Sequence, residues 1–351
     1  MKRDERQAIL KGLPKIELHR HLEGSLRLST MLELGRKYDL DLPLDSPAAL
    51  AKVVTFSKSE PRTLANFLTK FYSGWYRSYA DIERVTREAV NDAADEGIVH
   101  LELRFSPEHL TRSNKLQPRG VMQAVCESGQ ATAAERSISI KFLITFARER
   151  YEYSFWKELI DVGVELEELG IAGVDLAGDE FNFPNRDYQK IFLRARDTGV
   201  LGISIHSGEG TSAEQVATAV DLLGADRIGH GLKAVDDPEV IGRLVESGVA
   251  LEMCPISNFQ TGCIDKLPEH PLPQLDLAGI AVTLNADDPA IHRTTINDDY
   301  DVAVTRWGYN LEDLLRLERN SISAAFISDE QRATLSERVN QGYAISQGQG
   351  L

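Results

Sequence analysis

Histidines and carboxylates stand where short apolar runs of the sequence end. His19 and His21 lie two residues apart in the run 16–21, so on a strand both side chains point to the same face. His206 ends a second run, and Glu209 follows it on a glycine-flanked turn. Paired imidazoles suit a metal ion, and a carboxyl group beside a metal can move protons. The alternatives are two solvated histidines on a sheet edge and a hydrogen-bonded structural His206.

Two further groups of candidate residues follow apolar runs later in the sequence. His230 lies in Arg-Ile-Gly-His-Gly, and Asp287 and Asp288 precede a proline, which also fits a turn or helix cap. His19, His21, His206 and Asp287 form a ligand set that suits Zn²⁺ and tolerates other divalent ions. Such a site can lower the pKa of bound water to about 7. Glu209 would then transfer a proton, His230 would orient the water or act as a base, and Asp288 would bind substrate.

The elements that carry these groups alternate between two periodicities. Eight short apolar runs predict strands at 16–21, 99–105, 138–146, 171–176, 202–206, 227–230, 249–254 and 280–285. Helical periodicity appears at 81–96, 156–169, 188–198, 213–223 and 238–246. Alternation predicts a parallel sheet, and eight units predict a (β/α)₈ barrel rather than an open doubly wound sheet. The candidate residues then share the carboxyl-end rim, where such barrels place their active sites.

The remaining segments complete a predicted single catalytic domain over 1–351. Residues 1–14 read as a polar lead-in, and a helical region follows to about Val54. Leu64, Phe67, Leu68 and Phe71 have helical spacing, which fits either a helix packed on the core or a lid. Residues from about 310 to 346 predict peripheral helices outside the barrel, and 347–351 are expected to be disordered.

Composition limits the class of protein. The 351 residues include 39 basic and 54 acidic ones, a net charge of −15, which argues against nucleic acid and favours a small, neutral or weakly charged ligand. Three cysteines without paired spacing favour the reducing cytoplasm. We find no signal peptide and no apolar segment of membrane-spanning length, and no feature indicates an oligomeric state.

Two other motifs in the sequence suggest different functions. Residues 208–213 fit the pattern G-x-G-x-x-A of a dinucleotide-binding turn, but that function leaves the strand-end histidines unexplained. His21-Leu-Glu23 resembles half of the cytidine-deaminase zinc motif, whose Pro-Cys-x-x-Cys half is missing.

Six longer motifs follow one another between about Leu13 and Tyr300. They are Glu17-Leu-His-Arg-His-Leu-Glu-Gly-Ser-Leu26, Gly173-Val-Asp-Leu-Ala-Gly-Asp-Glu180, His206-Ser-Gly-Glu209, Arg227-Ile-Gly-His-Gly231, Cys254-Pro-Ile-Ser-Asn258 and Asn285-Ala-Asp-Asp-Pro289. As an ordered set they resemble the adenosine deaminase family of zinc amidohydrolase barrels.

The resemblance implies a role for each candidate residue. One zinc ion per chain would be held by His19, His21, His206 and Asp287. Glu209 would protonate purine N1, His230 would position the attacking hydroxide, and Asp288 would hydrogen-bond N7. The backbone of Gly178 would meet N3, with His21 and Glu23 also bordering the substrate. Leu64, Phe67 and Leu68 would form the family's hydrophobic lid over the purine.

The implied reaction converts adenosine and 2′-deoxyadenosine to their inosine products and ammonia. Nucleoside-specific members usually have aspartate where this chain has Glu23, and glutamate there is common in relatives that act on free adenine. Gly229 nevertheless agrees with the nucleoside enzymes. Free adenine, or a 5′-modified adenosine such as 6-aminodeoxyfutalosine, is therefore the alternative substrate. A silent nucleoside-binding protein and a two-metal hydrolase are less favoured, the latter because the fourth strand offers no bridging lysine.

Overall fold

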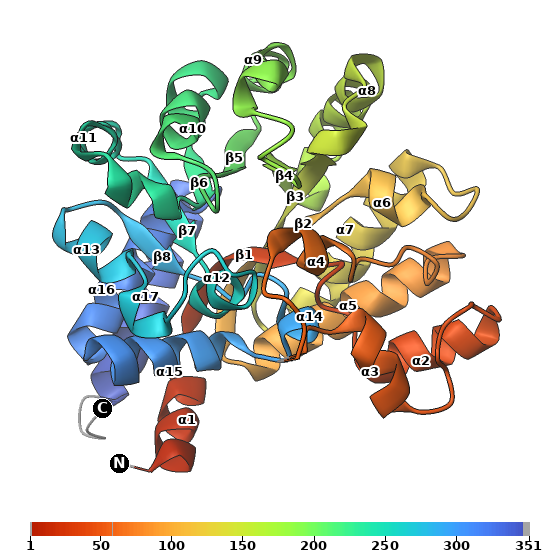
Figure 1. The fold of residues 1–351 in the computed structure, drawn as a ribbon, viewed down its shortest axis with the longest axis horizontal. Helices are drawn as coiled ribbons and strands as arrows, with labels where there is room; N and C mark the ends of the chain where they lie inside the picture. Colours follow the sequence, from red (N-terminus) through yellow and green to blue (C-terminus); the bar gives the residue numbers. More distant parts are fainter. Residues whose placement is uncertain (1, 58, 347–351) are drawn as a thin grey trace.

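The barrel predicted from the sequence is confirmed. The structure is a computed structural model that describes residues 2–57 and 59–346. Its eight strands form one sheet in chain order, and each neighbouring pair from β1 to β8 is parallel (Figure 1). The strands are β1 (Lys15–His21), β2 (Ile98–Phe105), β3 (Ser139–Ala147), β4 (Ile171–Ala177), β5 (Gly202–Ser207), β6 (Arg227–His230), β7 (Ala250–Met253) and β8 (Val282–Leu284).

Residues of the candidate site themselves connect the two ends of this sheet. Arg20 on β1 forms an isolated parallel bridge with Asp287, which follows β8. The backbone N–H of His21 donates to the carbonyl of Asp287 at 3.0 Å, and the N–H of Asp287 donates to the carbonyl of His19 at 2.9 Å. Barrel closure therefore fixes the predicted aspartate ligand against the predicted histidine pair.

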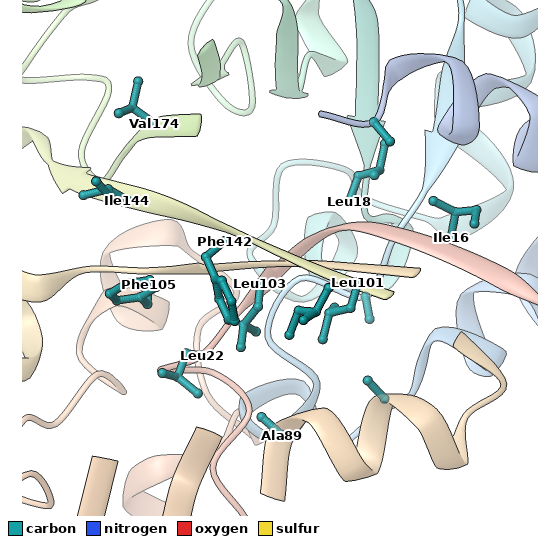
Figure 2. Packing of buried hydrophobic residues seen from close by; sticks show 14 of the residues in the cluster. Ile16, Leu18, Leu22, Ala89, Leu101, Leu103, Phe105, Phe142, Ile144 and Val174 are labelled. Atoms are coloured by element: carbon teal, nitrogen blue, oxygen red, sulfur yellow. The ribbon is translucent and has the colours of Figure 1, made fainter. Parts of the chain in front are cut away.

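The hydrophobic core lies between the strands and the surrounding helices. Figure 2 shows Leu101 and Leu103 of β2 on the side of the strands that faces Ala89 of α5 (Tyr79–Asp95). The barrel interior is instead charged: Arg227 pairs with Glu102 at 2.6 Å, and Arg104 pairs with Glu252 at 2.6 Å. Because each of these charges has a close partner, the ion pairs compensate one another away from water.

The helices surround the strands (Figure 1). They are α1 (Arg3–Gly12), α2 (Leu28–Lys37), α3 (Pro47–Val54), α4 (Leu64–Leu68), α5 (Tyr79–Asp95), α6 (Pro107–Thr111), α7 (Pro118–Glu135), α8 (Tyr153–Glu165), α9 (Gln189–Arg196), α10 (Ala213–Thr218), α11 (Pro238–Ser247), α12 (Pro255–Gln260), α13 (Leu272–Leu277), α14 (Pro289–His292), α15 (Ile296–Trp307), α16 (Leu311–Ala324) and α17 (Asp329–Ser346). Shorter turns are η1 (Arg148–Arg150), η2 (Glu167–Leu169), η3 (Asn185–Tyr188), η4 (Ala219–Leu223), η5 (Leu232–Asp236) and η6 (Leu267–Glu269).

The structure adds a helix at the N-terminal end of the chain and confirms the predicted helices near the C-terminal end. The polar lead-in predicted over residues 1–14 contains the helix α1, which the sequence did not predict. The fully buried Leu10 and an ion pair between Arg6 and Asp301 anchor this charged helix. The predicted C-terminal helices are present as α16 and α17, and α16 packs against β8 and β1 outside the barrel. Disorder predicted for 347–351 lies outside the described residues. Within those residues, every helix is too short or too polar to cross a bilayer.

Candidate active site

The four predicted ligands converge where β1, β5 and β8 end. Nε2 of His21 lies 3.2 Å from Nε2 of His206, and Oδ1 of Asp287 lies 3.3 Å from Nε2 of His19 and 3.4 Å from Nε2 of His21. One ligand atom from each of the four residues falls within 4.8 Å of the others. The predicted ligand set is thus brought together in space from three separate parts of the chain.

Buried carboxylates fix the orientation of two of these imidazoles. Nδ1 of His19 lies 2.7 Å from Glu252, and Nδ1 of His206 lies 2.9 Å from Asp175. Arg104 pairs with both carboxylates and keeps them ionised. Since each Nδ1 donates its hydrogen to a carboxylate, each Nε2 presents a lone pair to the centre, as metal-ligating histidines do. Among the described residues, the buried Nε2 of His19 has no hydrogen-bond partner, so a divalent cation fits this donor set.

Asp287 is held in one conformation by backbone and side chain together. Its φ of +64° is rare for a residue other than glycine and is found mostly at functional positions. Ser257 donates a hydrogen bond to Oδ2 at 2.7 Å, which leaves Oδ1 facing the histidines. Burial opposes ionisation, but the neighbouring imidazole of His19 holds the pKa of Asp287 well below its usual range. The side chain is therefore ionised at neutral pH, as a metal-binding carboxylate must be.

Glu209 and His230 stand together beside the ligand cluster. Nε2 of His230 lies 3.8 Å from Glu209 and 3.9 Å from Asp287. Asn258 donates to Nδ1 of His230 at 3.1 Å, so the neutral ring carries its hydrogen on Nε2 and directs it into the site. Burial lowers the pKa of His230 to about 4, whereas burial and the charge of Asp287 raise the pKa of Glu209. The pair offers a neutral hydrogen-bond donor and a carboxyl group that favours its protonated form.

Asp288 faces the same space as a buried acid. Its Oδ1 has no hydrogen-bond partner among the described residues, and burial together with Asp287 raises its pKa well above the usual range. Gly24 makes room for it, because a Cβ at that position would come within 1.7 Å of the Asp288 oxygen. A protonated Asp288 can donate to a ring nitrogen placed in the site.

The remaining predicted residues line one cavity of about 330 Å³, together with three of the four candidate ligands, His21, His206 and Asp287. Gly178 has a φ of +110°, and a Cβ there would meet the Glu149 carboxylate at 2.7 Å, so only glycine fits without displacement. Glu23 accepts a hydrogen bond from the backbone of Ser106 at 2.7 Å, and burial raises its pKa to about 7. The cavity is lined as well by Leu64, Phe67 and Leu68.

The helix that carries these apolar residues sits apart from the main core. Phe67 of α4 stacks on His292 with ring centres 5.1 Å apart and belongs to a small separate cluster with Phe56 and Ile291. Of the two interpretations that the spacing allowed, this position favours a cover over the cavity. The periodicity alone could not separate them, because a lid and a core helix present the same apolar stripe.

Several side chains at the site were not singled out from the sequence. Asp175 and Glu252 support the histidine ligands, and the cavity is also lined by Ser106, His109, Arg112, Thr145, Arg150 and Glu180. One signal was present: Glu252 interrupts a strand that is otherwise apolar, and a charged residue in a buried parallel strand needs a partner. Arg112 and Arg150 lie in connecting segments, where the sequence carries no comparable pattern.

Comparison with known proteins identifies the family of this chain. A family model described as adenosine deaminase matches residues 14–342. The chain belongs to the adenosine deaminase family. An adenosine deaminase from Erwinia tasmaniensis is 38% identical over 329 residues, which cover 93% of this chain and 98% of that relative. The resemblance drawn from the six motifs is confirmed.

Solved structures of related proteins show the same fold. Adenine deaminase from Arthrobacter aurescens matches with a TM-score of 0.85 and 28% identity, covering 94% of this chain and 98% of that one. Arabidopsis ADAL complexed with IMP matches with a TM-score of 0.84 and 26% identity, covering 96% and 98%. An adenine deaminase and a protein complexed with IMP therefore have the same barrel as this chain.

Proposed function

We propose that this member of the adenosine deaminase family hydrolyses adenosine and 2′-deoxyadenosine to inosine and 2′-deoxyinosine, with release of ammonia. The observation that carries the proposal is that the four candidate ligands lie together and that three of them, His21, His206 and Asp287, line one cavity with Glu209, His230 and Asp288. Relatives named adenosine deaminase, such as that of Erwinia tasmaniensis, match this chain over nearly their whole length.

A single Zn²⁺ ion is the proposed cofactor. Three imidazole nitrogens and one carboxylate oxygen form the type of ligand set that catalytic zinc uses. His19, His21, His206 and Asp287 would hold the ion, and Glu252 and Asp175 would keep two of the imidazoles in the ligating tautomer. When bound, the ion supplies a Lewis acid that makes water nucleophilic at neutral pH.

The protein groups around the cavity account for the rest of the reaction. Water adds to C6, the C6–N bond breaks, and the exocyclic amine leaves as ammonia. Glu209, whose protonated form is favoured by burial and by the charge of Asp287, gives a proton to N1 and so removes charge that would otherwise build up on the ring. His230 directs its Nε2 hydrogen toward the space between Glu209 and Asp287 and positions the incoming oxygen.

Three further groups would hold the purine ring in its orientation. Asp288 donates to N7, and the backbone of Gly178 meets N3, so the ring is held by both edges. Phe67 and its neighbours on α4 cover the purine and exclude water, which strengthens the polar contacts inside. The three free cysteines among the described residues agree with a reducing compartment, and we place the protein in the cytoplasm.

The experiment that tests this proposal is ammonia release by the purified, zinc-loaded protein from adenosine, 2′-deoxyadenosine, adenine and 6-aminodeoxyfutalosine in parallel. We expect fast turnover of the two nucleosides and poor turnover of adenine. Glu23 favours adenine or the 5′-modified nucleoside as the second candidate, and a preference for either would replace the substrate while keeping the chemistry. Absence of ammonia from every substrate, with metal bound, would refute the assignment as a deaminase.

A further inference from the structure

A second group of candidate metal ligands adjoins the proposed zinc site. His292, the last residue of α14, and the acids Asp287 and Asp288 each offer one ligand atom, and these three atoms lie within 4.8 Å of one another. All three side chains are buried, with exposed fractions of 3% for His292, 3% for Asp287 and 1% for Asp288. Asp287 belongs to both groups, and both aspartates line the purine cavity. The second group is therefore open to an ion that enters through that cavity.

The imidazole of His292 is oriented as a metal ligand would be. Gln260 donates from Nε2 to the backbone carbonyl of His292 at 3.1 Å, and its Oε1 lies 3.0 Å from Nδ1 of the ring. Because this arrangement makes Oε1 the acceptor of the Nδ1 hydrogen, Nε2 keeps its lone pair. Phe67 stacks on the ring with centres 5.1 Å apart and an angle of 6° between the planes, which restricts its rotation. An outer hydrogen bond that fixes the tautomer is typical of histidines that bind metals.

Two atoms of this group lack a partner within the part of the chain that the structure describes. Nε2 of His292 is buried there without a hydrogen bond, and the same is true of Oδ1 of Asp288. Buried polar atoms are normally paired, so each unpartnered atom needs an explanation. A lone pair on nitrogen and a carboxylate oxygen have in common that both can bind a cation.

We propose that Asp287, Asp288 and His292 form a second, inhibitory binding site for Zn²⁺ beside the proposed catalytic one. One imidazole nitrogen and two carboxylate oxygens suit zinc and related first-row divalent ions, whereas Mg²⁺ prefers oxygen ligands alone. Asp287 would be a ligand of both ions. The net charge of −15 favours the uptake of a further cation by this chain.

The second ion inhibits because it occupies a group that the substrate needs. Asp288 is assigned to N7 of the purine, to which it can donate only as a protonated acid. An ion bound to Asp288 takes the place of that proton, so zinc and purine exclude each other at this side chain. The second ion has three protein ligands and must displace a proton, and it therefore binds more weakly than an ion held by His19, His21, His206 and Asp287. The inhibition rests on the proposed deamination, but the metal site does not.

The test counts zinc bound to the full chain by equilibrium dialysis and elemental analysis, over buffered free Zn²⁺ that rises to a large excess. We expect the wild type to bind a first ion tightly and a second one more weakly. His292→Phe keeps a ring that can stack on Phe67 but has no ligand atom, so the Kd for the second ion should rise by roughly tenfold or more. Asp288→Asn is a second variant with the same expected loss.

His109→Phe is the matched control for this count. His109 is a buried imidazole that lines the same cavity, and its ring already packs against Phe71 and Tyr76, with ring centres 6.4 Å and 6.0 Å away. It has no place in the second group of ligands. This variant should therefore still bind the second ion with the wild-type Kd.

Ammonia release and product binding give two further readouts. Once the first ion is saturated, additional zinc should raise KM for adenosine and leave kcat unchanged in the wild type, with a smaller effect in His292→Phe. Saturating inosine should in turn prevent the second ion from binding.

The outcomes for the metal site and for the proposed reaction can be told apart, because counting metal needs no turnover. A second ion that depends on His292 supports the site even if no substrate releases ammonia, a result that would refute only the deaminase assignment. A single ion per chain in the wild type, or a second ion bound equally well by His292→Phe, would overturn the inference. A second ion that saturating inosine leaves in place would also overturn it, because the ion would then not compete for Asp288.

Discussion

Replacing Ser257 by alanine should weaken metal binding without disturbing the fold. Ser257 donates to Oδ2 of Asp287 at 2.7 Å, and Oδ1 of the same carboxylate faces the histidines. A hydrogen bond to a charged group contributes about 1.5–3 kcal/mol. If that energy fixes the ligand, its loss corresponds to roughly a 10- to 100-fold higher Kd for zinc.

The assay is competition for Zn²⁺ against a chromogenic chelator, with apo-protein unfolding measured in parallel. Ser321→Ala is the matched control, because Ser321 is equally buried and donates to the carbonyl of Leu317 at 3.0 Å within α16, away from the site. We expect only Ser257→Ala to raise the Kd for zinc. A change below threefold, or an equal change in the control, would refute the reasoning that this hydrogen bond orients the ligand.

Three further changes test other parts of the site and fold. His206→Ala should lose bound metal and ammonia release together, which metal analysis and a turnover assay can check; retained metal would contradict its role as a ligand. Phe67→Ala should raise KM for adenosine by roughly tenfold or more, since it removes aromatic surface from the cavity, and a changed kcat with constant KM would contradict the lid. Burial raises the pKa of Glu318 to about 7, so the folded state holds a proton that the unfolded state releases between about pH 4.5 and 7. As the pH rises through that range, the free energy of unfolding of the apo-protein, measured with urea, should therefore fall by up to about 3 kcal/mol. It should fall less in Glu318→Gln, and equal pH dependences of the two proteins would contradict the shift.

Strand ends were the part of the fold that the sequence predicted best. Apolar runs such as 202–206 are short, end at turn residues, and fall close to the observed β5. Helices were predicted less completely, because α7 (Pro118–Glu135) contains many small and polar residues and is buried along several faces, which hides a simple stripe. The prediction that 1–351 acts as one catalytic domain stays a prediction.

The residues of the candidate site were also predicted unevenly from the sequence. His19, His21 and His206 could be selected because the barrel rule places strand ends at one rim, and their distances agree with that rule. The supporting Glu252 and the cavity-lining Arg112 and Arg150 could not, since their place at the site depends on contacts between segments far apart in the chain. Single-sequence patterns report what each element presents, and only the folded barrel shows which elements meet.

The most direct test of the central claim is Glu209→Gln, measured for both metal content and turnover of adenosine. Glutamine keeps the size of the side chain and its contacts with Thr261 and Asn258 but has no acidic proton to give. The account predicts wild-type zinc content and a fall in kcat of about 10²- to 10⁴-fold, the range expected for loss of a general acid. A variant with near wild-type kcat, or one that loses its metal, would contradict the assignment of Glu209 as the proton donor beside a separate ligand set.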